Sequence, residues 1–237
     1  MRNESKQISP EGSLLDEIIK GLRENDSFLG EKAVETHDEI VNCVNDAISN
    51  PYFTAATPEE DIKSCITFFV RHVLMPSGYG IYLDLLAGNL PSCFVKVRLM
   101  LESLVKCYVA DCRYPDVTFF EERIELLDKA LRQERCSISE LMRQLGERLG
   151  IGNEFGKLWR ALSNDWVHTK GIANNIASHM ANVPGLPSWA LVIPMPYSDA
   201  DLEVINKLGK VISQFRELLK IAIETYRTES IKEKGTS

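Results

Sequence analysis

The chain has 237 residues, enough for one large domain or two small ones. Hydrophobic residues make up 44% and charged residues 26%, which is typical of a globular protein with a sizeable core and argues against extensive disorder. The formal net charge of −7 disfavours nonspecific binding to the phosphate backbone of nucleic acids.

The first third of the chain has the hydrophobic spacing of amphipathic helices. Ser13 is a suitable N-cap for a helix in which apolar residues recur over 14–22 at i, i+3 and i+4. A second helix is predicted over 34–48. A third is capped by Thr57 and is expected to end at Pro76, because proline and the glycine that follows it interrupt helices.

The remainder of the chain continues the helical pattern, with one interruption. Thr118, Ser137 and Ser198 are each followed three residues later by Glu or Asp, which is the spacing of a capping box. The segment 171–198 differs because it contains no Asp, Glu, Lys or Arg and four prolines. These prolines would break a membrane-spanning helix, so we expect an irregular segment and no membrane insertion.

These patterns predict an all-α protein, an irregular bundle of about eight to ten helices with a proline-rich segment before the last one. We expect a single domain over 13–228, between flexible tails at 1–12 and 229–237. The N-terminal residues lack the apolar stretch of a signal peptide, and the six cysteines form no CxxC pair. A cytoplasmic protein with reduced thiols is therefore expected.

The densest group of polar side chains lies in the Trp-rich stretch GNEFGKLWRALSNDWVHTKG, residues 152–171. At 100° per residue, one arc of about 100° is apolar and is expected to face the core. It holds Phe155, Leu158, Trp159, Leu162 and Trp166. The opposite side carries Arg160, Asn164 and His168.

Arg160 and His168 are the first candidates for catalysis, with Asn164 and Asp165 as residues that could tune the histidine. On a continuous helix they stand about 12 Å apart along the axis and about 80° apart around it. They can contact one ligand only if the helix ends near Val167 and the chain turns back. Asp165 and His168 lack a third ligand in sequence reach, so we predict no metal site and no cofactor.

Arg98 and Glu102 form the second candidate site. They are four residues apart on a helix whose core face carries Phe94, Val97, Leu101, Leu104, Val105 and Tyr108. One interpretation is an exposed ladder of Arg98, Glu102 and Lys106, worth a few tenths of a kcal/mol per pair. The other is a half-buried polar cluster in which Arg98 and Glu102 meet the segment from Ser163 to His168, next to Trp166.

The helix RLMLESLVKCYV, followed later by LWRALSNDWVHTKG, resembles the HEPN-like superfamily (higher eukaryotes and prokaryotes nucleotide-binding). The resemblance covers roughly 78–170 and implies a HEPN-like core over about 78–228, a twofold homodimer, and a toxin–antitoxin or phage-defence setting. Active HEPN ribonucleases carry Arg-x4–6-His, in which histidine is the acid/base and arginine holds the scissile phosphate. In this chain seven residues separate Arg160 from His168.

Three functions follow as hypotheses. The first is a non-enzymatic HEPN-like protein that acts by association, as a homodimer or with another protein partner. The second is a metal-independent ribonuclease that uses Arg160 and His168. The third is a helical bundle that binds a small ligand or an anion, in a pocket bounded by Arg98, Glu102, Trp166 and the proline-rich segment.

Overall fold

The computed structural model describes residues 13–54, 63–167 and 194–234. Within these ranges the chain forms helices and no strand, which confirms the predicted all-α class. None of the helices in these ranges is long and apolar enough to cross a membrane. Most of the uncharged segment and the proposed cap Thr57 lie outside the described residues.

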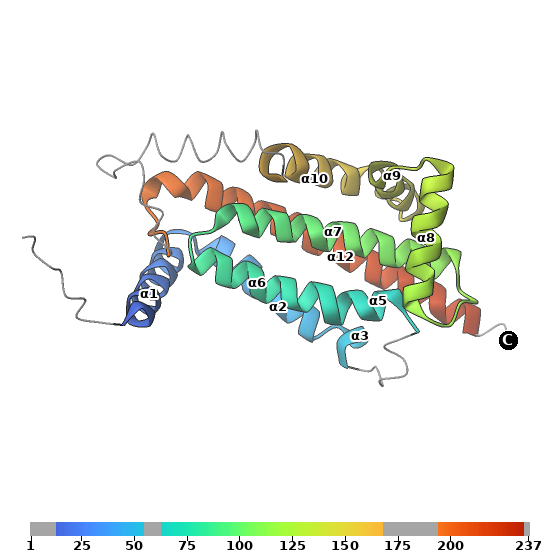
Figure 1. Ribbon diagram of the computed structural model, residues 1–237, viewed down its shortest axis with the longest axis horizontal. Helices are drawn as coiled ribbons and strands as arrows, with labels where there is room; N and C mark the ends of the chain where they lie inside the picture. Colours follow the sequence, from blue (N-terminus) through green and yellow to red (C-terminus); the bar gives the residue numbers. More distant parts are fainter. Residues whose placement is uncertain (1–12, 55–62, 168–193, 235–237) are drawn as a thin grey trace, which may run out of the picture.

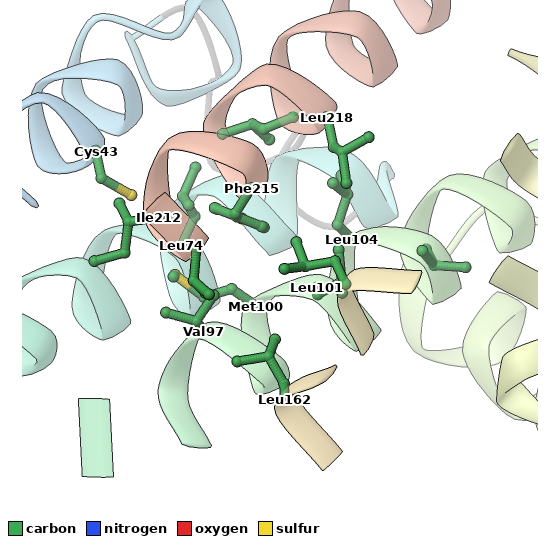
Figure 2. Close-up of a cluster of buried hydrophobic side chains, with 14 of the residues drawn as sticks. Cys43, Leu74, Val97, Met100, Leu101, Leu104, Leu162, Ile212, Phe215 and Leu218 are labelled. Atoms are coloured by element: carbon green, nitrogen blue, oxygen red, sulfur yellow. The ribbon is translucent and has the colours of Figure 1, made fainter. Parts of the chain in front are cut away.

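Two long helices, α7 (Leu90–Arg113) and α12 (Leu202–Lys234), run side by side along the long axis of the molecule (Figure 1). They pack with α2 (Val34–Ile48) and α6 (Met75–Leu86). The predicted core face of α7 is confirmed, because all six of its apolar side chains are fully buried. In Figure 2, Met100, Leu101 and Leu104 of α7 lie against Ile212 and Phe215 of α12.

Shorter helices cover the two ends and one edge of this core. At one end α8 (Phe120–Glu134) crosses α7, and α9 (Ile138–Arg148) and α10 (Glu154–Leu162) lie along the edge of α7 (Figure 1). The helix α1 (Leu14–Lys32) lies at the opposite end. A four-residue helix, α3 (Pro51–Thr54), follows α2.

The predicted helix end at Pro76 is wrong, because the chain passes without a break from α5 (Cys65–Phe68) through a π-helical stretch, η1 (Phe69–Leu74), into α6. In this stretch the Met75 N–H donates to the Val70 carbonyl, five residues back. Pro76 is the second residue of α6, directly after the π-helical stretch, so a proline here does not end the helix.

The helix caps follow the sequence in three of four described cases. Ser13 and Ser198 each form a complete capping box, and the Ser137 hydroxyl accepts from the Glu140 N–H. The predicted cap at Thr118 is wrong: α8 begins at Phe120, and its N-cap residue, Phe119, offers no side-chain oxygen. Phe120, the first residue of the helix, packs against the core, and this tertiary contact overrides the cap signal.

Asn25 joins α1 to the end of α6 and to the segment that precedes α12. Its Nδ2 donates to the carbonyls of Leu86 (2.8 Å) and Met195 (2.9 Å), and its Oδ1 accepts from the Tyr197 N–H (3.0 Å). Gly88 makes this approach possible: its φ is +73°, and a Cβ there would lie 2.3 Å from the Met195 carbonyl oxygen. One buried side chain therefore ties α1 to both of these segments.

Candidate functional site

Glu102 links α7 to α10. Its Oε1 accepts hydrogen bonds from Arg98 Nε (2.7 Å) and from Trp159 Nε1 (2.6 Å). The Arg98 guanidinium also lies over the Trp159 ring, 5.0 Å from its centre. The predicted pairing of Arg98 with Glu102 is therefore present, and both side chains are only about a quarter exposed. The partner from α10 is Trp159 and not the serine that the cluster hypothesis named.

Lys106 does not extend this pair into a ladder. Its Nζ donates to Asp128 of α8 (2.9 Å), so the side chain turns away from Glu102. The helix α7 therefore makes two separate polar contacts with its neighbours, Glu102 with α10 and Lys106 with α8. Each contact holds a neighbouring helix against α7, which is a structural role.

Ser163 and Trp166 lie in a short π-helical stretch, η2 (Ser163–Val167), that continues α10. The Ser163 hydroxyl is buried and donates to the Trp159 carbonyl (2.7 Å), so it is used within its own helix. The Trp166 ring is 3% exposed and stacks on Phe94, with 3.9 Å between ring centres and 7° between planes. The prediction that both tryptophans face inward is thus confirmed for Trp166, while Trp159 is half-buried.

The candidate catalytic residues fall on the exposed side of this stretch. Arg160 is exposed, and its Nε donates to the Gly156 carbonyl of its own helix (3.2 Å). Asn164 is exposed, and Asp165 accepts from Lys207 of α12 (2.6 Å). His168 lies outside the described residues, so its position relative to Arg160 stays a prediction.

Two other histidines can be placed. His37 stacks edge-on against Tyr82, and His72 is exposed and packs on Phe68. Among the residues that the structure describes, no three His, Cys, Asp or Glu side chains are grouped so as to hold a metal ion.

The most completely bonded polar group in the described core is Asp111, which the sequence reasoning missed. One carboxylate oxygen accepts from Cys65 N–H (2.9 Å) and Arg123 Nη1 (2.6 Å). The other accepts from the Ile66 N–H (3.0 Å), the Ser64 hydroxyl (3.1 Å) and the Tyr226 hydroxyl (2.9 Å). Burial and the neighbouring Asp111 raise the pKa of Tyr226. The sequence did carry a signal for this residue: Asp111 is an acid on the core face of α7, four residues after Cys107.

The role of Asp111 is to stabilise the fold. It binds the first N–H groups of α5, which have no partner within that helix, and it neutralises Arg123, whose side chain is only 10% exposed. Arg123 also donates to the carbonyls of Val117 and Pro115, which hold the turn before α8. Every polar atom mentioned here bonds within the chain, which is the arrangement of a structural cluster.

A second missed feature is the outer α6–α7 face, which we define by four apolar side chains that solvent reaches. Tyr79 and Leu83 of α6 are 48% and 60% exposed, and Val95 and Leu99 of α7 are 42% and 51% exposed. In each helix the two residues are four apart, so each pair forms a ridge on one side of its helix. The sequence signal was that Val95 and Leu99 are apolar yet lie off the core face of α7.

Between the two ridges lies a polar floor. Lys96 of α7 reaches across Gly80, where a Cβ would lie 2.8 Å from the lysine Cε. Its ammonium bonds to Asp84 of α6 and to Ser92 of its own helix. The charges on the floor are therefore paired within the chain, and the outer α6–α7 face is apolar at its ridges and neutral at its centre.

The fold and these contacts define an all-α protein with a clamped core and an uncovered apolar face. No family model, no curated protein and no solved structure matches the chain. The HEPN-like resemblance accordingly stays a prediction from the sequence.

Proposed function

We propose that this protein works by association, and that the outer α6–α7 face is the surface through which it binds another polypeptide, first of all a second copy of itself. The observation that carries the proposal is the exposure of Tyr79, Leu83, Val95 and Leu99 on two helices packed against each other. Single exposed apolar residues are ordinary on protein surfaces, whereas apolar groups gathered on neighbouring helices mark interaction sites.

The energetics favour covering this face. Removing apolar surface from water stabilises a contact by roughly 25 cal/mol per Å². Leu83 and Leu99 belong to helices that α2, α10 and α12 hold from their other sides, so the face is rigid before it binds. A partner therefore does not have to order these helices, which keeps the entropic cost of association low.

Electrostatics point to the same face. Each copy carries a formal charge of −7, so two copies repel each other over most of their surface. The outer α6–α7 face is an exception, because Lys96 pairs with Asp84 and Arg98 pairs with Glu102 inside one chain. Two copies, or a partner of either sign, can approach here without leaving a charge uncompensated. The twofold dimer implied by the HEPN-like resemblance agrees with this proposal.

The test is the mass of the protein in solution. Sedimentation equilibrium of the wild type should show reversible dimers, and Leu83→Glu/Leu99→Glu should weaken dimerisation at least tenfold. A matched control is Phe119→Glu/Leu126→Glu, because it adds the same charge at two exposed apolar residues around α8 (46% and 38% exposed). The control should dimerise like the wild type. A monomeric wild type at all concentrations, or equal dimerisation of both variants, would overturn the proposal.

A further inference from the structure

The helix α1 has an apolar face that the described protein covers at one end only. Near its C-terminal end Asn25 and Leu29 are buried, at 1% and 0% exposure. Near its start Leu14, Leu15 and Ile19 are 73%, 61% and 37% exposed. The helix therefore passes from a packed C-terminal end, through the half-buried Ile18 and Leu22, to a start whose apolar side chains face water.

Both halves present the same side of the helix. At 100° per residue, five positions fall within an arc of about 80°. They are Leu15, Ile18, Leu22, Asn25 and Leu29. The face that contacts the core at Leu29 thus continues without rotation to Leu15. A helix is rarely this apolar on a side that stays in solvent, so the first half of α1 has the form of a binding element.

The direction of α1 is fixed by its anchored half. Asn25 bonds to Leu86, Met195 and Tyr197, and Gly21 lies so close to Pro194 that a Cβ there would be 3.0 Å from the proline ring. In Figure 1 the N-terminal end of α1 points away from the other helices. Held in this way, Leu14, Leu15 and Ile19 stay exposed within their own chain.

We infer that the first half of α1 in one copy packs on the outer α6–α7 face of a second copy, and that the exchange is reciprocal. The inference rests on the proposed function and names the segment that occupies the face. Each copy contributes one helix and receives one, so the two contacts are related by a twofold axis and the assembly closes at two copies. One arrangement then covers both apolar surfaces that the described structure leaves open.

The outer α6–α7 face carries two apolar ridges, Tyr79 with Leu83 and Val95 with Leu99, against which an amphipathic helix can lay its apolar side chains. Leu15 and Ile19, which are exposed and four residues apart, supply two such anchors on one side of α1.

The charges of α1 favour a protein surface over a lipid surface as its binding partner. Residues 14–24 carry Asp16, Glu17 and Glu24 against Lys20 and Arg23, a net charge of −1, and Lys20 pairs with Glu24. A helix that binds anionic membranes is instead rich in Lys and Arg on its polar side. The slightly acidic start of α1 meets no opposing net charge on the outer α6–α7 face, whose own charges are already paired.

Complementation between two variants tests the inference. Leu15→Glu/Ile19→Glu damages the helix and leaves the face intact, whereas Leu83→Glu/Leu99→Glu damages the face and leaves the helix intact. All four residues are exposed, so both variants should fold, and circular dichroism and thermal unfolding verify this. Each variant alone should dimerise at least tenfold more weakly than the wild type. The mixture should form mixed dimers more tightly than either variant self-associates, because one helix–face contact is intact. Two-colour sedimentation velocity measures this.

The alternatives give different results. If two α6–α7 faces bind each other, the α1 variant will dimerise like the wild type. If two α1 helices bind each other, the face variant will dimerise like the wild type. Either result, or a mixture that associates no better than its components, overturns the exchange. The first result leaves the proposed function standing, whereas a wild type that stays monomeric overturns both.

Discussion

Arg123 Nη1 lies 2.6 Å from Asp111 Oδ1, and the two side chains are 10% and 2% exposed. They join α8 to α7 across a distance of twelve residues in sequence, and Asp111 at the same time caps α5. A buried pair of this kind contributes to stability mainly through what happens when one member is lost, since the other is left as an uncompensated charge.

Asp111→Ala should therefore lower the free energy of unfolding by about 3–5 kcal/mol. The matched control is Glu134→Ala, which removes the partner of Arg113 from a pair that lies in solvent (3.3 Å, 52% and 33% exposed). The control should cost less than about 1 kcal/mol. Urea unfolding followed by circular dichroism measures both. Equal losses in the two variants would contradict the structural role assigned to Asp111.

Glu102 should contribute more to the free energy of unfolding than Lys106, one helical turn further along α7. Glu102→Ala removes the shared acceptor of Arg98 and Trp159, and we expect a loss of about 1–3 kcal/mol together with a change in tryptophan fluorescence. Lys106→Ala breaks only the half-exposed pair with Asp128 and should cost roughly 0–1 kcal/mol. If the two losses are alike, Glu102 does not clamp α10 to α7.

The ring of Trp166 should stabilise the fold, whereas its indole N–H should not. Its indole Nε1 is buried and has no hydrogen-bond partner among the described residues, while its ring stacks on Phe94. Trp166→Phe keeps most of the stack and removes the unpaired donor, so it should cost less than about 1.5 kcal/mol. Trp166→Ala leaves a cavity and should cost about 3–5 kcal/mol. A phenylalanine variant as unstable as the alanine variant would show that the N–H is used.

Added salt should strengthen self-association. Because each copy carries −7, screening reduces the repulsion between copies, while the apolar contacts proposed here are insensitive to it. Raising NaCl from about 0.05 M to about 0.5 M should lower the dimer dissociation constant several-fold in sedimentation equilibrium. A dimer that dissociates as salt rises would indicate an interface of ion pairs, which the outer α6–α7 face does not provide.

The cysteines should differ in reactivity according to burial. Burial raises the pKa of the Cys43 thiol to about 12, and it raises the pKa values of Cys93 and Cys107 as well. Alkylation requires the thiolate, so at pH 8 these three should stay unmodified by iodoacetamide in the folded protein. Cys112 and Cys136 are half-buried and should react first. Mass spectrometry of digested samples reads this out, and rapid labelling of Cys107 would contradict the packing of α7.

Helical periodicity was enough to predict the class of fold and the inward face of α7, because burying an apolar stripe is a local requirement that appears every three to four residues. It also predicted the pairing of Arg98 with Glu102, since residues four apart on a helix are neighbours whatever surrounds them. Even Ser13, Ser137 and Ser198 acted as caps as expected, for the same local reason.

Contacts between distant segments could not be predicted from helical periodicity or local spacing. Glu102 reaches Trp159 from 57 residues away and Asn25 reaches Met195 from 170 residues away, and no spacing in the chain encodes either distance. Likewise, Leu15 lies on the same side of α1 as the buried Leu29, so periodicity alone gives it a core position. Only the packed tertiary structure decides that this end of the helix is left uncovered. Burial is a property of the assembled helices, and so the surface that we propose for binding could be seen only after assembly.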